Sequence, residues 1–196
     1  MFGEEYTLVA VADYVLKHTP GNTVSNLSSS RALKDVTEAY GQQYHAAAVG
    51  EVNVVSEMKR THSVIGGEGN GGVIYPESHY GRDALVGVGL FLSHYVAQSK
   101  KMTELKSTYP PYFISKNKMT LSPDMDVDKI LEGLKERYAT EKVTDIDGVK
   151  IDFAQGWVHL RKSNTEPIIR IYSEAKDEAA ANQLAEEVIA AAKSTF

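Results

Sequence analysis

The sequence predicts an α/β protein, in which a mixed-sheet α/β domain is followed by a smaller α+β domain with an antiparallel sheet and helices on one face. Three observations lead to this prediction. Helix-like and strand-like segments alternate in the first half, strands follow one another through tight turns in the second half, and Pro110 and Pro111 separate the two patterns. Paired prolines end a helix and favour extended chain. We therefore expect domains at residues 1–108 and 109–196.

The first domain is expected to alternate helices and strands. Apolar residues recur at helical spacing from Leu8 to Leu16, and Pro20 and Gly21 end this helix. The elements expected next are a strand at 23–27, a helix from 30 to 40, a strand at 44–49, a helix through Val52, Val55 and Met58, a strand at 63–65, a glycine loop at 66–72, a strand at 72–75 and an apolar core helix at 82–99. Loops at strand ends of such domains commonly bind ligands.

The second domain is expected to contain mostly strands, with a helix near its start and another at its end. The expected elements are a strand at 113–118, a helix at 126–138, strands at 149–153, 157–161 and 168–172, and a helix at 177–193. The turn at Ala154–Gly156 is short enough to join antiparallel neighbours.

Composition excludes several classes of function. Acidic residues outnumber basic residues by 26 to 21 in this chain of 196 residues, so the overall charge does not favour nucleic acid. There is no cysteine and no apolar run of the roughly 20 residues that a membrane helix needs. We expect no membrane association and a cytoplasmic location. The chain begins within an apolar helical pattern, without a leader sequence, so we expect that an upstream portion has been cut off.

The first candidate site is the glycine segment. Five glycines among residues 66–72 carry a high cost in chain entropy, which indicates that something approaches their backbone closely. Glu68 and Asn70 alternate with these glycines and could bracket neighbouring hydroxyls of a sugar. The alternative is a flexible turn with Glu68 in solvent. The segment lacks the lysine of a phosphate-binding P-loop and the later acidic residue of a dinucleotide site.

The second candidate site lies between two expected strands. Arg161 and Arg170 supply two guanidinium groups, Ser163 and Thr165 supply hydroxyls, and the turn around Asn164 supplies backbone N–H groups. A phosphate dianion requires this set of donors. The alternative is a β-turn whose surface arginines pair with nearby glutamates.

Both segments, in this order, resemble the α-D-phosphohexomutases, whose third domain carries G-E-x-S/N-G and whose fourth carries R-x-S-G/N-T-E-P-x-x-R. EEYTLVAVADYVL, SSSRAL and VGEVNV also resemble third-domain segments. The resemblance implies that the sugar is bound by Glu68 and Asn70, with Gly67, Gly69 and Gly71. It also implies that the phosphate that is not transferred is bound by Arg161, Ser163, Asn164, Thr165 and Arg170. Lys162 and Asn164 depart from the commoner residues of the second motif.

The resemblance also implies what this chain lacks. The family's phosphoserine and its magnesium-binding D-x-D-x-D-R loop are not found here. Asp124, Asp126 and Asp128 alternate, but they precede a helix and are better interpreted as N-terminal helix charges. We therefore expect no catalytic residue and no metal ligand in this chain. Mg²⁺ would be bound by a missing upstream domain.

The expected function is that of the C-terminal part of a phosphohexomutase, which interconverts hexose 6-phosphate and hexose 1-phosphate. Its partners would be the hexose phosphate and the missing N-terminal domains. The E-x-N-G-G form resembles archaeal-type phosphoglucosamine mutases, so glucosamine phosphate is the first expectation and mannose or glucose phosphate the second. Two alternatives from other classes remain, a non-catalytic sugar-phosphate-binding module and a domain whose arginines bind an acidic peptide.

Overall fold

The computed structural model describes residues 2–122, 125–163 and 165–194. The chain divides into two compact units, unit 1 at Met1–Pro111 and unit 2 at Tyr112–Phe196. In the described residues no helix is both long enough and apolar enough to cross a membrane.

Unit 1 is built on a four-stranded mixed sheet in the order β2-β1-β3-β4. Its strands are β1 (Thr23–Asn26), β2 (Tyr44–Ala47), β3 (Ile65–Glu68) and β4 (Gly72–Ile74). β1 runs parallel to β2 and β3, whereas β4 runs antiparallel to β3. The alternation of helices and strands thus gives the expected mixed sheet, because helices connect its parallel strands.

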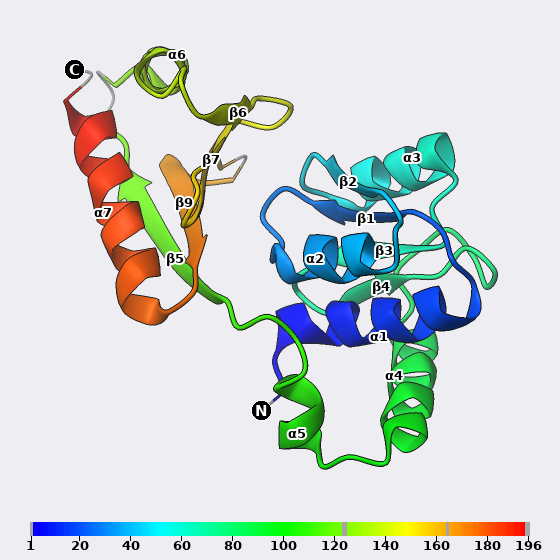
Figure 1. The fold of residues 1–196 in the computed structure, drawn as a ribbon. Coiled ribbons are helices and arrows are strands. Elements are labelled where there is room, and N and C mark those ends of the chain that lie inside the picture. Colours follow the sequence, from blue (N-terminus) through cyan, green and yellow to red (C-terminus); the bar gives the residue numbers. More distant parts are fainter. Residues whose placement is uncertain (1, 123–124, 164, 195–196) are drawn as a thin grey trace. The chain divides into compact units, whose positions relative to one another are not determined.

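The described residues of unit 1 form five helices, namely α1 (Glu4–His18), α2 (Ala32–Ala39), α3 (Glu51–Thr61), α4 (Ala84–Gln98) and α5 (Met102–Lys106). α1 and α3 lie on opposite sides of the sheet (Figure 1). α1 is apolar on most sides, and Leu8, Val11 and Leu16 are at most 1% exposed. Burial of such side chains is the main stabilising contribution to unit 1.

The expectation that the helix at 82–99 belongs to the core was wrong. α4 is a helix as expected, but it is not a core helix, because Leu85 is 85% exposed and Val96 is 74% exposed. The helix expected through Val52, Val55 and Met58 is α3, in which Met58 is buried and Val55 packs against the core, whereas Val52 is 77% exposed. Helical spacing shows that apolar residues share one face of a helix. It does not show whether that face packs against the sheet, since that depends on neighbouring elements.

A partly buried polar cluster fixes the end of unit 1 to its helices. Asp13 of α1 accepts hydrogen bonds from the hydroxyls of Tyr40, at 2.6 Å, and Tyr109, at 2.9 Å. His94 Nε2 of α4 lies 2.8 Å from the Tyr109 hydroxyl, and burial lowers the pKa of His94. Tyr6 also donates to the carbonyl of Pro110 at 2.6 Å. The chain before the boundary between the units is therefore held firmly by unit 1.

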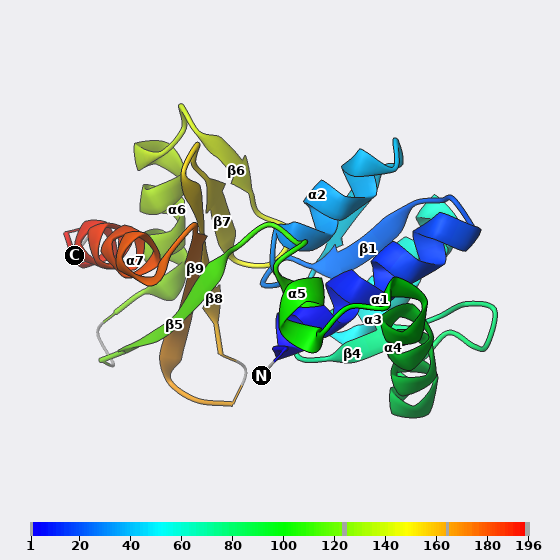
Figure 2. The ribbon, with the colours of Figure 1, turned by 60° about the horizontal axis from the view of Figure 1, so that its bottom comes forward.

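Unit 2 contains a five-stranded antiparallel sheet in the order β5-β9-β8-β7-β6. Its strands are β5 (Phe113–Thr120), β6 (Lys142–Thr144), β7 (Val149–Asp152), β8 (Gly156–Lys162) and β9 (Ile168–Ala175). Both helices, α6 (Val127–Arg137) and α7 (Glu178–Lys193), cover the same face of this sheet (Figure 2). The expected α+β arrangement is confirmed. The short β6 and the short α5 were not expected from the sequence.

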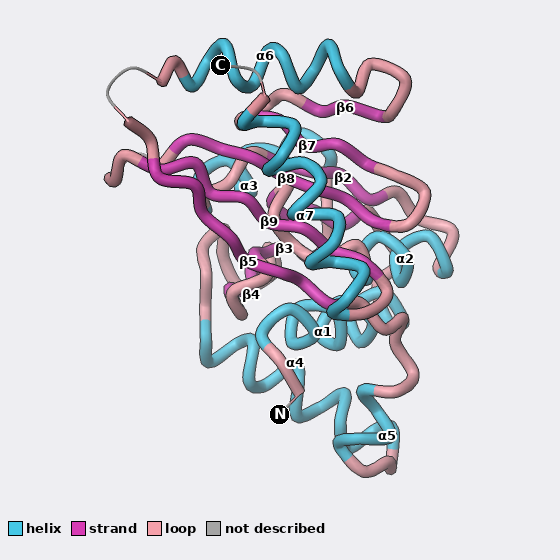
Figure 3. Tube along the Cα trace, turned by 90° about the vertical axis from the view of Figure 1, so that its left-hand side faces the viewer, coloured by secondary structure: helices cyan, strands magenta, loops and turns pink. Residues whose placement is uncertain are grey.

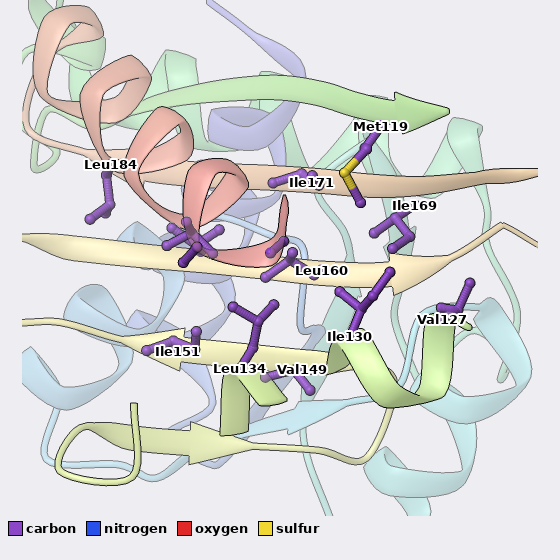
Figure 4. Close-up of a cluster of buried hydrophobic side chains, with 14 residues drawn as sticks. Met119, Val127, Ile130, Leu134, Val149, Ile151, Leu160, Ile169, Ile171 and Leu184 are labelled. Carbon is purple, nitrogen blue, oxygen red and sulfur yellow. The ribbon is translucent and has the colours of Figure 1, made fainter. Parts of the chain in front are cut away.

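The core of unit 2 lies between the sheet and these two helices. Ile130 and Leu134 of α6 point toward Leu160 of β8 and Ile169 of β9 (Figure 4). Asp126 begins α6 by accepting from the N–H groups of Asp128 and Lys129, which is the helix-start role expected for it. Asp124 lies outside the described residues.

Candidate functional site

The glycine segment forms a tight β-hairpin, and the expected loop at 66–72 was wrong. Residues 65–68 are strand β3, 72–74 are strand β4, and Gly69, Asn70 and Gly71 form the turn between them. Gly71 has a φ of 86°, a conformation that favours glycine. Asn70 is exposed, and its side chain accepts from the N–H of Gly72 at 3.1 Å.

The close approach that the glycines allow is made by the protein itself. A Cβ at Gly66 would lie 2.6 Å from the sulfur of Met58, and a Cβ at Gly69 would collide with the carboxylate of Glu5. The N–H of Gly69 also donates to the hydroxyl of Ser29 at 2.8 Å. Several of these glycines are therefore required by packing of the hairpin, so their number alone does not indicate a ligand.

Glu68 is buried rather than displayed in solvent, because its side chain is 6% exposed at the end of β3. One carboxylate oxygen accepts from Asn26 Nδ2 at 2.9 Å and from the N–H of Gly50 at 3.2 Å. The other lies 3.4 Å from Nη1 of Arg82. A carboxylate has about four acceptor positions, so these three donors leave about one for a ligand.

The network around Glu68 lies where the parallel strands β1 and β3 end. Asn26 is the last residue of β1, and Gly50 immediately precedes α3. The carboxylate of Glu68 therefore lies close to the N-terminus of α3, where it accepts from the N–H of Gly50. In sheets of this kind ligands bind at this edge.

A second carboxylate joins the network through Arg82. Glu51 accepts from both the Nε and the backbone N–H of Arg82, each at 2.9 Å. These hydrogen bonds, that of the backbone first, lower the pKa of Glu51. Arg82 thus bridges two carboxylates and is itself 47% exposed.

A pocket of about 510 Å³ opens beside the hairpin turn, within unit 1. Its lining includes Glu51, Asn70, Arg82 and Asp83. Carboxylate, amide and guanidinium groups together provide both donors and acceptors, as a ligand rich in hydroxyl groups requires. Asn70 reaches this pocket, whereas Glu68 lies behind Arg82 and is not among its lining residues.

The arginine segment places its two guanidinium groups on neighbouring strands. Arg161 of β8 and Arg170 of β9 are direct cross-strand partners. Their sequence neighbours Leu160, Ile169 and Ile171 belong to the core beneath α6 and α7. Because side chains alternate along a strand, both arginines lie on the opposite face of the sheet.

The arginines differ in their partners. Arg170 Nη2 donates to Glu166 at 3.2 Å in an exposed ion pair, as one alternative from the sequence expected. The Nε of Arg161 is buried and has no hydrogen-bond partner among the described residues. Like charges placed directly opposite each other destabilise a sheet, and a buried donor without a partner adds to this cost. This arrangement is suited to binding an anion.

The hydroxyl groups of the segment belong to the connection between the two strands that carry the arginines. Ser163 is 6% exposed, its N–H donates to the carbonyl of Ile168 at 3.0 Å, and its Oγ lies 3.5 Å from Oγ1 of Thr165. Thr165 is exposed. Asn164 lies outside the described residues. The strand pairing thus brings Arg161, Ser163, Thr165 and Arg170 into one region.

Several residues of the candidate site were missed from the sequence. Asn26, Glu51 and Arg82 were not expected to contact the glycine segment, although Glu51 belongs to the VGEVNV segment. The available signal was the position of Asn26 near the end of the strand expected at 23–27. In the described residues no cluster of three or more His, Asp or Glu side chains could hold a metal ion.

Comparison with known protein families identifies two consecutive domains in this chain. The family model for phosphoglucomutase/phosphomannomutase, alpha/beta/alpha domain III, matches residues 3–112, and the model for the C-terminal domain of the same family matches residues 116–191.

Curated relatives include two mutases. A phosphoglucosamine/phosphogalactosamine mutase of Sulfurisphaera tokodaii is 36% identical over 84% of this chain and 37% of the relative. A phosphoglucomutase/phosphomannomutase of Thermococcus kodakarensis is 37% identical over 92% of this chain and 40% of the relative. The chain thus spans about two fifths of the length of these relatives.

A solved structure extends the similarity to the fold. The phosphoglucomutase/phosphomannomutase family protein of Burkholderia thailandensis matches 97% of this chain and 41% of its own, with a TM-score of 0.80 and 22% identity. The matches to two consecutive family domains assign the chain to one family. The arginine pair on the antiparallel sheet and the G-E-x-N-G hairpin are consistent with that family. The chain therefore belongs to the phosphoglucomutase/phosphomannomutase family, of which it contains domain III and the C-terminal domain.

Proposed function

We propose that this chain is the sugar-binding and phosphate-binding part of a phosphohexomutase that interconverts hexose 6-phosphate and hexose 1-phosphate. In this proposal residues 1–108 form the sugar-binding domain and residues 109–196 the phosphate-binding domain. An upstream part of the same protein would carry the phosphoserine.

One observation carries the proposal, namely the direct pairing of Arg161 with Arg170 beside two hydroxyl groups. Two guanidinium groups on one face bind a phosphate in a fixed orientation, which a single lysine does not. Arg161, Ser163, Thr165 and Arg170, together with Asn164, would hold the phosphate that is not being transferred. The ion pair with Glu166 is exposed and therefore weak, so phosphate can compete for Arg170.

The hairpin would recognise the sugar ring. Asn70 lies at the pocket beside the turn and can both donate to and accept from hydroxyl groups. Glu68 would offer its remaining acceptor position, and Gly67, Gly69 and Gly71 would bring the backbone close to the ring. Because either end of the sugar must face the reactive serine in turn, the clamp would hold whichever phosphate is distant from that serine, so the role proposed for this chain is to position the substrate.

In this proposal Mg²⁺ would be bound by the upstream part of the protein and not by this chain. The cytoplasmic location expected from the sequence also remains part of the proposal. Glucosamine phosphate is the first choice of substrate, supported by the E-x-N-G-G form of the hairpin and by the name of the Sulfurisphaera tokodaii relative. Mannose or glucose phosphate is the second choice, supported by the name of the Thermococcus kodakarensis relative.

Titration of the chain with glucosamine 6-phosphate, mannose 6-phosphate and glucose 6-phosphate, followed by NMR chemical shifts, tests this proposal. We expect weak saturable binding that Arg161→Gln and Arg170→Gln each weaken by about tenfold or more, because each removes a charge-assisted hydrogen bond of about 1.5–3 kcal/mol.

Arg137→Gln is the matched control. Arg137 is an arginine of the same unit at the end of α6 and donates to Ser194 rather than facing the paired arginines. Equal binding by all variants would refute the phosphate site. Binding of an acidic peptide but of no sugar phosphate would favour the interaction-domain alternative.

A further inference from the structure

A third cationic residue, Lys118, is aligned with the paired arginines across the sheet. Lys118 of β5 is the direct cross-strand partner of Arg170, which is in turn the direct partner of Arg161. The three strands are neighbours in the order β5-β9-β8 (Figure 3). We call these three residues the cation row.

All three side chains lie on the face of the sheet that α6 and α7 leave uncovered. Directly paired residues in an antiparallel sheet share a face, and Met119, which follows Lys118, belongs to the core beneath the helices. Lys118 is exposed, so its ammonium group is accessible to a ligand.

The end of β5 is also tied to the phosphate-binding segment. Leu121 donates its N–H to the carbonyl of Pro167 at 2.9 Å, and Thr120 is the cross-strand partner of Ile168. Neighbouring strands lie about 4.8 Å apart. Lys118 is therefore held one strand from Arg170 on the side away from Arg161, and its long side chain can reach the same anion.

The positive charge of the cation row favours binding of a doubly charged anion. Among the described residues, the carboxylate of Glu166 is the only one that forms an ion pair with the row, through Arg170. Two like-charged pairs side by side are unfavourable in the free protein. The whole chain has a formal net charge of −5, so this local excess of positive charge is not a property of the general surface. A phosphate monoester carries about −1.5 to −2 at neutral pH, which matches the excess.

We propose that Lys118 is a third cationic phosphate-binding residue, beside Arg161 and Arg170, which makes the site selective for the dianionic form of phosphate. This inference rests on the proposed function, because it assigns a further residue to the same anion site. Arg161 and Arg170 orient the phosphate through their planar guanidinium groups, and Lys118 adds a point charge on the open side.

Lys116 provides a matched control. It lies two residues earlier on β5, on the same face and equally exposed, but its ammonium group lies 5.7 Å from the centre of the Tyr172 ring. A residue two positions away along a strand is displaced by about 7 Å. Removal of either lysine changes the net charge equally, so a difference between them reports position rather than overall charge.

The experiment is titration of the chain with inorganic phosphate at constant ionic strength and at several pH values between 5.5 and 8, followed by NMR chemical shifts. We expect Lys118→Gln to weaken binding about three- to tenfold above pH 7 and less at pH 5.5, where phosphate is a monoanion. Lys116→Gln should change the affinity less than about twofold, and Lys118→Arg should restore it. Without phosphate, Lys118→Gln should leave Tm unchanged or raise it, since a like-charge pair is removed.

The outcomes separate the two proposals. If wild type binds phosphate and Arg161→Gln abolishes binding but Lys118→Gln and Lys116→Gln behave alike, Lys118 is not a ligand and the proposed function stands. If the wild-type chain binds no phosphate at any pH, both proposals fail. A loss of Tm in Lys118→Gln without phosphate would indicate a structural role instead.

Discussion

At the scale of single residues, Glu68 illustrates how a motif residue acquires a second role from the fold. Its position among glycines suggested either a sugar ligand or a residue in solvent. In the structure its carboxylate is buried and receives three donors, from Asn26, Gly50 and Arg82. It therefore connects the ends of two strands and the start of α3, in addition to any ligand that it binds.

Replacement of Glu68 should accordingly reduce stability. In Glu68→Gln the amide cannot satisfy Arg82 and the N–H of Gly50 as a carboxylate does, so we expect unit 1 to lose about 1–3 kcal/mol in its free energy of unfolding. Urea unfolding monitored by circular dichroism measures this loss. Glu77→Gln is the control, since Glu77 is exposed and accepts from Tyr75, and its effect should stay below about 0.5 kcal/mol. Equal effects would show that the network does not stabilise the hairpin.

The arginine segment was more accessible to prediction at this scale. Arg161 and Arg170 belong to two strands joined by a short connection, so local register alone brings them together. The contacts of Glu68 depend instead on residues 18 and 42 positions away in sequence, at Gly50 and Asn26. Pattern along the chain predicts the first kind of contact and not the second.

At the scale of elements, α4 shows the limit of hydrophobicity as a sign of burial. Its helical spacing was recognised, but Leu85, Val88, Leu92 and Val96 are each more than half exposed. Their spacing places them on one helix face, turned away from α1 and β4, which α4 contacts. A contiguous exposed apolar face of this kind is uncommon on monomeric proteins.

The exposure of α4 makes a quantitative prediction. Leu85→Ala should change the free energy of unfolding by less than about 0.5 kcal/mol, because its side chain is already in water. Leu16→Ala on α1, where the leucine is fully buried, should cost about 2–5 kcal/mol. Chemical denaturation of the two variants provides the comparison. A large loss in Leu85→Ala would mean that this face is covered in solution.

The glycine hairpin shows the converse error at the same scale. Its composition suggested a loop, but strands β3 and β4 form because their glycines allow Met58 of α3 and the antiparallel partner strand to approach closely. Glycine disfavours a strand by itself. Packing between elements outweighs that preference here.

At the scale of the whole molecule, the length of the relatives bears on activity. The chain spans about two fifths of the curated relatives that it matches. If the division of labour that we propose is correct, the chain by itself should bind hexose phosphates and convert none of them. A coupled assay for the interconversion of glucosamine 6-phosphate and glucosamine 1-phosphate, with hexose 1,6-bisphosphate and Mg²⁺ present, tests this expectation. Turnover above background by the purified chain would contradict the proposal.

The sequence by itself determined the fold class, the order of nearly all elements and the segment that brings Arg161 and Arg170 together, because these depend on periodicity, turn residues and pairing of adjacent strands. The tertiary structure alone decided which faces of α3 and α4 are buried, why the hairpin needs its glycines, and that Asn26 and Arg82 hold Glu68. It also aligned Lys118 with the arginines, since β5 and β9 are far apart in sequence and meet only when the sheet forms. Contacts between distant segments depend on how the helices and strands pack, and a local sequence pattern does not predict that packing.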